Sequence, residues 1–147
     1  MRAVVQRVAR ARVAVSGDAV GEIGAGICVL LGVSREDGRA EAERLAGKVA
    51  RLRIFENEDG KFDRSLLDVG GGALVVSQFT LIADSKRQKG TRPDFSHAAR
   101  PEVAEPIYEH FVRALGDLGV PVETGVFGAR MTLESINNGP VTLILDV

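Results

Sequence analysis

Apolar and polar residues alternate along the N-terminal part of the chain, over residues 2–9 and 12–16. Successive side chains of a strand point to opposite faces, so this alternation predicts strands with one buried face. Ser16-Gly17-Asp18 supplies a turn before residues 19–23, and we expect an antiparallel meander here. Residues 27–33 are apolar throughout, which predicts a central strand that is covered on both faces.

Apolar residues then recur at spacings of three and four, which is typical of amphipathic helices. The first such stretch lies within residues 34–54, and Ser34 or Asp37 is expected to cap it. Its apolar positions are Ala42, Leu45, Ala46, Val49 and Leu52. The apolar positions of the second are Val103, Ile107, Phe111, Leu115 and Leu118. Pro106 is expected to open the second helix or to break its first turn.

The most apolar run besides residues 27–33 is ALVVSQFTLIAD, residues 73–84, and it predicts a buried strand. Ser77, Gln78 and Thr80 lie within it. A buried hydroxyl or amide without a partner costs about 1–3 kcal/mol, so polar groups clustered at the end of a core strand are candidates for a binding site. Hydrogen bonds to neighbouring backbone are an equally good explanation of these residues taken alone.

Three further strands are predicted near the C-terminus, at residues 120–124, 131–136 and 141–147. Asn137-Asn138-Gly139-Pro140 separates the last two. Asn-Gly is a favoured turn pair, and composition alone favours a hairpin. Pro140 is unusual there because it removes a backbone donor where a strand begins, and such a turn would leave a rigid ridge of backbone.

Composition adds limits to this picture. The 147 residues predict a single domain, 1–147, and the formal net charge is −1, so any affinity for a polyanion must come from a local patch. No apolar run approaches the ~20 residues of a membrane span, and the N-terminus lacks the features of a signal peptide. The single cysteine, Cys28, is expected in the core, and the lack of a disulfide framework indicates a reducing, cytoplasmic location.

Positive charge is concentrated in residues 85–101, SKRQKGTRPDFSHAARP, which Gly90 and Pro93 mark as a loop. Its cations are Lys86, Arg87, Lys89, Arg92 and Arg100, against one acid, Asp94. Such a loop beside a polar strand end is suited to hold phosphates, although a merely solvated loop is the alternative. His97 and His110 lack further ligands at metal-binding spacing, and the acidic turn at residues 56–59 lacks calcium-loop spacing, so no metal site is expected.

Two motifs then point to a known family. Residues 77–81, SQFTL, and 137–142, NNGPVT, resemble the two signature motifs of the D-aminoacyl-tRNA deacylases. The opening VVQRV and the segments KGTRPDFS and GVFGARM also resemble that family at matching places. The resemblance runs from Met1 to Val147 without a missing segment, and two motifs at the right separation make it specific.

This resemblance implies a cytoplasmic homodimer that hydrolyses the ester between a D-amino acid and the 3′ end of tRNA. Glycine has no side chain to exclude, so glycyl-tRNA is also an expected substrate. It implies an α/β fold of antiparallel sheets rolled into a barrel-like core, with two main helices packed outside. No cofactor, metal or membrane partner is expected.

The resemblance also implies roles for particular residues. Gly139-Pro140 would be cis and project into the partner subunit's pocket to reject L-aminoacyl-tRNA, with Asn137 in the same motif. Arg7 matches a residue that supports that pair, in agreement with its place on the inward face of its strand, where a carboxylate or carbonyl is expected. The first motif lines the catalytic site, so Ser77, Gln78, Phe79 and Thr80 are candidates there. Phe127 and Met131 match residues near the amino-acid pocket, and Lys86, Arg87 and Lys89 are candidates for tRNA capture.

The sequence shows no Ser-His-Asp triad and no paired carboxylates. Backbone N–H groups near Phe79 and Thr80 are therefore candidates for an oxyanion hole. The resemblance to the family implies that the substrate's own 2′-hydroxyl carries out the proton transfer. The alternative makes Thr80 a covalent nucleophile, but no adjacent base is evident. Two other classes stay open, a catalytically silent module that binds RNA ends and a purely structural dimer.

Overall fold

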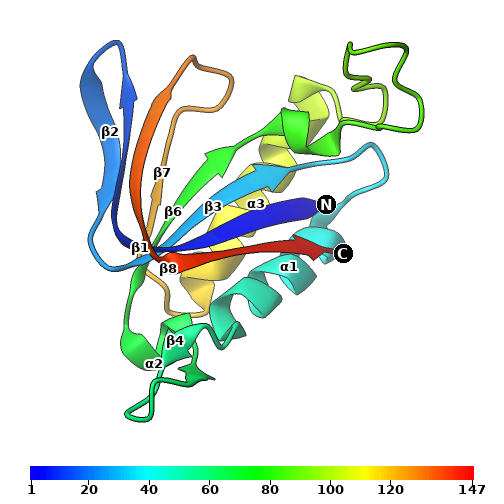
Figure 1. The fold of residues 1–147 in the computed structure, drawn as a ribbon. Helices are drawn as coiled ribbons and strands as arrows, with labels where there is room; N and C mark the ends of the chain where they lie inside the picture. Colours follow the sequence, from blue (N-terminus) through cyan, green and yellow to red (C-terminus); the bar gives the residue numbers. More distant parts are fainter.

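The computed structural model describes residues 1–147, and one long strand, β1 (Arg2–Val15), runs through the middle of its sheet. β1 pairs antiparallel with β3 (Gly26–Gly32) through its first half and with β2 (Asp18–Ile23) through its second half. Its other edge pairs antiparallel with β8 (Thr132–Asp146) along nearly its whole length. The predicted meander is confirmed, with the first two predicted strands joined in one (Figure 1).

The rest of the sheet is parallel. β6 (Gly72–Ser77) pairs with β3, and β7 (Val122–Thr124) pairs with β6. β2 also contacts β7, so the sheet curls into a nearly closed barrel. The approach is close: a Cβ at Gly21 in β2 would lie 2.5 Å from the carbonyl oxygen of Thr124 in β7. The predicted α/β class with a barrel-like core is confirmed, and the sheet is mixed.

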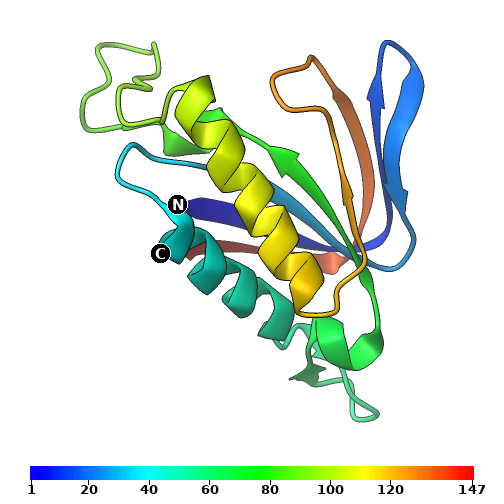
Figure 2. The same ribbon diagram turned by 180° about the vertical axis from the view of Figure 1, so that it is seen from behind.

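Two main helices, α1 (Arg39–Arg51) and α3 (Pro101–Asp117), pack side by side on one face of the sheet (Figure 2). They bury the apolar faces that the sequence predicts, with Leu45 and Val49 on α1 and Phe111 and Leu115 on α3 fully enclosed. Burial of such side chains contributes about 1.5–3 kcal/mol each. None of the helices has both the length and the apolar character that crossing a membrane needs.

The predicted cap of the first helix is wrong. Gly38 is the N-cap residue, and its N–H donates to the carboxylate of Glu41 at 2.9 Å. Asp37 instead accepts from the N–H and hydroxyl of Ser34 at 2.6 and 2.7 Å. It also pairs with the α-amino group of Met1 at 2.6 Å, so Ser34 and Asp37 tie the chain start to the loop before the helix.

The expectation for Pro106 is also wrong, because α3 begins at Pro101 and continues through Pro106. The missing N–H would have bonded the carbonyl of Glu102, which lies in the first turn. The residues that follow anchor the helix, since Tyr108 and Phe111 are buried. Val103, which the pattern assigns to the apolar face, is 47% exposed.

β6 ends at Ser77, so the predicted strand through residue 84 is too long. Ser77 is the last residue of β6 with a partner, Leu31 on β3. Gln78 still donates its N–H to the Leu31 carbonyl at 2.8 Å, and the chain then turns into a short 3₁₀-helix, η1 (Phe79–Ile82). The strand stops because the chain turns into η1 and leaves the edge of β3.

The hairpin that composition favours at Asn137–Pro140 does not form. Both halves of β8 pair with the same strand, with Gln6 opposite Thr142 and Val8 opposite Asn137. Residues 138–141 therefore bulge out opposite the single residue Arg7. We call residues 138–140 the backbone ridge. It lies near a small hairpin of β4 (Phe55–Glu56) and β5 (Phe62–Arg64), which a short helix, α2 (Leu66–Val69), follows (Figure 1).

Candidate functional site

An apolar cavity of about 530 Å³ opens where β6 ends, between the start of α3 and the segment that leads into β8. Its lining combines residues from the first motif with residues from the segments 99–104 and 127–133. These are Leu30, Val33, Val76, Ser77, Gln78, Phe79, Ala99, Pro101, Ala104, Phe127, Gly128, Ala129, Met131 and Leu133. The structure thus brings together five of the predicted site residues, Ser77, Gln78, Phe79, Phe127 and Met131.

The polar groups of the first motif lie at the rim of this apolar cavity. Ser77 is half-buried, and the Gln78 side-chain amide donates to the Thr80 hydroxyl at 2.5 Å. Thr80 is exposed and does not line the cavity, and the Gln78 amide is the only side chain hydrogen-bonded to its hydroxyl. Phe79 is 56% exposed and packs edge-on against Phe95 at a centroid distance of 5.2 Å.

Sequence reasoning missed two aromatic residues that shape this site. Phe95 supports Phe79, and the only signal for it was its place in the segment KGTRPDFS. Tyr108 packs against Phe127 at 5.7 Å and donates its hydroxyl to the Val75 carbonyl at 2.8 Å. Burial, together with Glu109, raises the pKa of Tyr108 to about 12, so this hydroxyl stays protonated and acts as a structural donor.

Arg7 is one of the few buried polar residues, at 7% exposure, and it confirms the predicted inward position. Its Nε donates to the Asn138 carbonyl at 2.8 Å, and its Nη1 donates to the Ile54 carbonyl at 2.7 Å. Its Nη2 lies 3.4 Å from the Glu56 carboxylate, and the guanidinium faces the Phe62 ring. Through these hydrogen bonds, Arg7 links the backbone ridge to the segment between α1 and β4.

The backbone ridge exposes Gly139 and Pro140, and the peptide bond between them is cis. Gly139 has a φ of +142°, and a Cβ there would lie 2.7 Å from Cγ2 of Val141, so the position requires glycine. The Asn137 side chain accepts from the Val141 N–H at 2.7 Å and donates to the Thr142 hydroxyl at 2.9 Å. None of these residues lines the apolar cavity, so one chain holds the two motifs apart.

The basic loop, residues 85–101, reaches the apolar cavity through Ala99 and Pro101. Lys86, Arg87 and Lys89 are all exposed. Arg87 lies 3.6 Å from the Asp84 carboxylate, whereas Lys86 and Lys89 have no carboxylate partner. The N–H of Ser96 donates to the Asp94 carboxylate at 2.8 Å, and the nearby hydroxyl and N–H of Ser96 hold the pKa of that carboxyl below its usual range, so the acid stays ionised. The loop as a whole remains positive.

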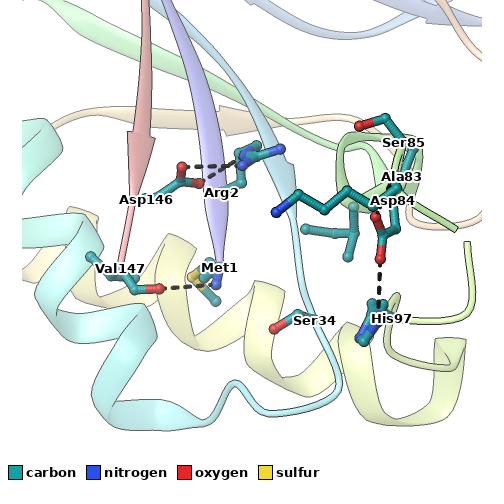
Figure 3. A pocket seen from close by; sticks show the side chains of 11 residues that line it. Met1, Arg2, Ser34, Ala83, Asp84, Ser85, His97, Asp146 and Val147 are labelled. Carbon is teal, nitrogen blue, oxygen red and sulfur yellow. Dashed lines mark hydrogen bonds and ion pairs between the residues drawn. The ribbon is translucent and has the colours of Figure 1, made fainter.

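A second cavity, of about 440 Å³, opens at the other end of η1 (Figure 3). Arg2 pairs there with Asp146 at 2.8 Å, and His97 lies 3.6 Å from Asp84. Lys86 also lines this space. Because Asp84 and Asp146 balance the cations, this cavity is less suited to anions than the basic loop outside it.

Cys28 and His110 lie outside both of these cavities. Cys28 is fully buried, as expected, and burial raises the pKa of its thiol to about 11, so the thiolate that reacts is rare at neutral pH. His110 bonds Glu43 at 2.8 Å between α1 and α3, away from the first motif. The chain has no group of three or more His, Cys, Asp or Glu side chains placed to hold a metal ion.

Comparisons with known proteins agree with this geometry. The family model described as D-Tyr-tRNA(Tyr) deacylase matches residues 4–146. The chain is 58% identical to D-aminoacyl-tRNA deacylases of Symbiobacterium thermophilum and Thermus aquaticus, in each case over 99% of this chain and 95% of the relative.

Two solved structures share the fold. One, titled c-Myc DNA Unwinding Element Binding Protein, has a TM-score of 0.92 at 45% identity and covers 100% of this chain and 99% of its own. The other, titled as a probable eukaryotic D-amino acid tRNA deacylase, has a TM-score of 0.82 at 19% identity over 99% and 98% of the two chains. The chain therefore belongs to the D-Tyr-tRNA(Tyr) deacylase family, which makes it a hydrolase that acts on the ester of aminoacyl-tRNA.

Proposed function

We propose that this chain is a chiral proofreading enzyme, which cleaves D-aminoacyl-tRNA and glycyl-tRNA and rejects L-aminoacyl-tRNA at the backbone ridge. The observation that carries the proposal is the exposed Gly139-Pro140 pair, which a buried arginine holds in place. It lies outside the apolar cavity of its own chain. Hydrolysis of D- and L-tyrosyl-tRNA by the purified protein is the direct test.

The separation of ridge and cavity supports a homodimer. The exposed ridge does not line the cavity of its own chain, so it can complete only the cavity of a second copy. In a symmetric pair each subunit would insert its ridge into the cavity of the other. In this proposal the partner subunit's cavity receives Gly139-Pro140. Such a dimer would work where tRNA is charged, in the cytoplasm. Sedimentation of the purified protein checks the dimer, and a monomer at assay concentration would contradict it.

Chiral selection by backbone has a physical advantage over selection by an apolar pocket. One methylene more or less in a soft pocket changes binding by only about 1–3 kcal/mol. Backbone atoms cannot move aside by a change of rotamer, so a substrate side chain that would overlap them is excluded. If ridge carbonyls hold the ammonium group and the hydrogen on the α-carbon, an L side chain would occupy the space of the ridge. A D side chain would point outward, and glycine has nothing to exclude.

The hydrolytic step in this proposal uses backbone donors and the substrate. N–H groups at the start of η1, near Phe79 and Thr80, stabilise the oxyanion at the cavity rim, a device that contributes about 3–4 kcal/mol per donor in studied hydrolases. Water attacks the ester carbonyl and the bond to the 3′-oxygen breaks, while the neighbouring 2′-hydroxyl relays the proton of that water to the leaving 3′-oxygen. Ser77, Gln78 and Phe79 shape the rim, and no cofactor or metal takes part. The exposure of Thr80 and the lack of a nearby base support this route over a threonine nucleophile.

Replacing Thr80→Ala is expected to leave deacylation of D-tyrosyl-tRNA within about tenfold of the wild-type rate, because only a hydroxyl bonded to Gln78 is lost. Single-turnover kinetics with saturating enzyme measure the chemical step. Thr132→Ala, at another exposed threonine, is the control. A loss of several orders of magnitude in a folded Thr80→Ala protein would establish the nucleophile instead.

Neutralising the basic loop, in Lys86→Gln/Arg87→Gln/Lys89→Gln, is expected to weaken tRNA binding and to flatten its dependence on salt. Each lost phosphate contact lowers the slope of log K against log salt by about 0.7–0.9. Filter binding of deacylated tRNA at several salt concentrations gives that slope. Unchanged affinity in the triple variant would remove the loop from tRNA capture.

A second candidate is nucleic-acid binding without turnover. The similar structure titled as a DNA unwinding element binding protein, together with the basic loop, favours considering it. The two functions separate in one assay, because a silent binder would retain aminoacyl-tRNA on the filter without releasing the amino acid.

A further inference from the structure

The C-terminal half of α1 lies away from the basic loop (Figure 2). It carries a second group of cations. An open groove of about 810 Å³ separates α1 from the end of β8. We call it the α1 groove. It is lined by Glu43, Arg44, Gly47, Lys48, Arg51, Leu52, Arg53 and Leu145. Four of these eight residues are cations and one is an acid.

Two of the four cations have no carboxylate partner. Arg44 pairs with Glu41 at 2.8 Å, and Arg53 pairs with Asp63. Lys48 reaches only the Asp146 carbonyl at 3.5 Å, and Arg51 reaches only the Gly47 carbonyl at 3.3 Å.

The single acid of the α1 groove is also engaged elsewhere. Glu43 is bonded to His110 at 2.8 Å. The positive charge of Lys48 and Arg51 is therefore open to solvent, and it suits the closely spaced phosphates of an RNA strand.

The α1 groove ends beside the backbone ridge. Arg53 directly precedes Ile54, whose carbonyl accepts from Arg7 at 2.7 Å. The same guanidinium donates to the Asn138 carbonyl at 2.8 Å. One side chain thus contacts both the ridge and the residue that follows Arg53 of the groove, so the ridge and this end of the α1 groove are neighbours.

We propose that the α1 groove binds the phosphate backbone of the tRNA whose 3′ end lies in the partner subunit's cavity. The inference rests on the proposed function, in which the ridge of one subunit enters the cavity of the other. The basic loop borders the cavity of its own chain, whereas the α1 groove accompanies the ridge. One tRNA therefore contacts the loop of one subunit and the α1 groove of the other.

The first test is the variant Lys48→Gln/Arg51→Gln. Its matched control, Arg10→Gln/Arg12→Gln, makes the same change of charge on β1. Deacylation of D-tyrosyl-tRNA is compared with that of D-tyrosyl-adenosine, which has no phosphates to reach the α1 groove. We expect the ratio of the two kcat/KM values to fall about tenfold in the groove variant and to hold in the control. The salt slope of tRNA binding falls by about 1.5 in the groove variant alone.

A heterodimer then tests which subunit supplies each surface. One subunit carries Lys48→Gln/Arg51→Gln, and the other carries Lys86→Gln/Arg87→Gln/Lys89→Gln, with two affinity tags to isolate the mixed species. If loop and α1 groove act across the dimer, one site is damaged twice and the other is intact. The heterodimer then keeps tRNA turnover well above that of either variant homodimer. Turnover no higher than in the homodimers would overturn the arrangement, because each site would then carry one damaged surface.

These results separate failure of the inference from failure of the proposed function. Wild-type protein that is monomeric, or that does not cleave D-tyrosyl-tRNA, contradicts the proposed function, and the inference falls with it. Wild-type protein that is dimeric and active, with the groove variant equal to its control, contradicts the α1 groove alone.

Discussion

Purified protein is expected to release tyrosine from D-tyrosyl-tRNA more than about 200-fold faster than from L-tyrosyl-tRNA, which exceeds what one methylene in a soft apolar pocket provides. This expectation rests on the proposed function, in which an L side chain alone would collide with the exposed ridge of Gly139 and Pro140. Matched tRNAs carrying labelled D- or L-tyrosine give the two rates, measured with and without EDTA. The D rate should not change with the chelator.

Further substrates test the same selectivity in the same assay. Glycyl-tRNA is expected to be cleaved along with the D ester, because glycine has no side chain to exclude. Several D-amino acids should be accepted at comparable rates, since the proposed function places their side chains away from the ridge. Equal release from D and L esters would end the role of the ridge while keeping the hydrolase, and acceptance of a single D-amino acid would also contradict it.

Replacing Arg7→Met is expected to lower the free energy of unfolding by roughly 2–6 kcal/mol, because two carbonyls at Asn138 and Ile54 lose a buried donor worth about 1–3 kcal/mol each. Methionine fills much of the volume, so the effect is mainly electrostatic. The same change should let the ridge move and raise the L rate relative to the D rate. Urea unfolding gives the stability, and the tyrosyl-tRNA assay gives the selectivity.

Arg12→Met is the matched control for Arg7. Arg12 lies on the same strand and pairs with Glu134 at 3.5 Å near the surface, so its loss should cost less than about 1 kcal/mol. Arg7→Lys keeps the charge with fewer donors and should fall between the two, which preserves the test if Arg7→Met does not fold. An Arg7→Met protein as stable and selective as Arg12→Met would show that the ridge needs no support from β1.

Local periodicity predicted the elements well wherever one face of an element is buried. The apolar stripe of α1 and the alternation in β1 were both visible because packing repeats with the period of the element. The ends of elements were not visible in this way. β6 ends at Ser77, where its pairing with Leu31 of β3 ends, and that pairing depends on a strand more than forty residues earlier in the chain.

The bulge in β8 shows the same limit at the candidate site. Asn-Gly is locally a good turn, yet the residues on both sides pair with β1 and leave the ridge opposite Arg7. Only the position of Arg7 on the inward face of its strand hinted at a carbonyl there. The gathering of Ser77, Phe79, Phe127 and Met131 followed from the family resemblance, since the segments that carry them are distant in the chain.

The pairing of β1 with β8 also constrains when the protein can become active during its synthesis. β1 precedes β8 by more than a hundred residues in the chain and is therefore synthesised earlier, yet the two strands are neighbours along nearly their whole length. Until β8 leaves the ribosome, one edge of the central strand is open to pairing with another chain. During the same period, the Asn138 carbonyl that accepts from Arg7 is not yet in place. Truncated products that lack residues 132–146 should therefore aggregate rather than act as unselective hydrolases, so incomplete translation is not expected to release an enzyme that damages correctly charged tRNA.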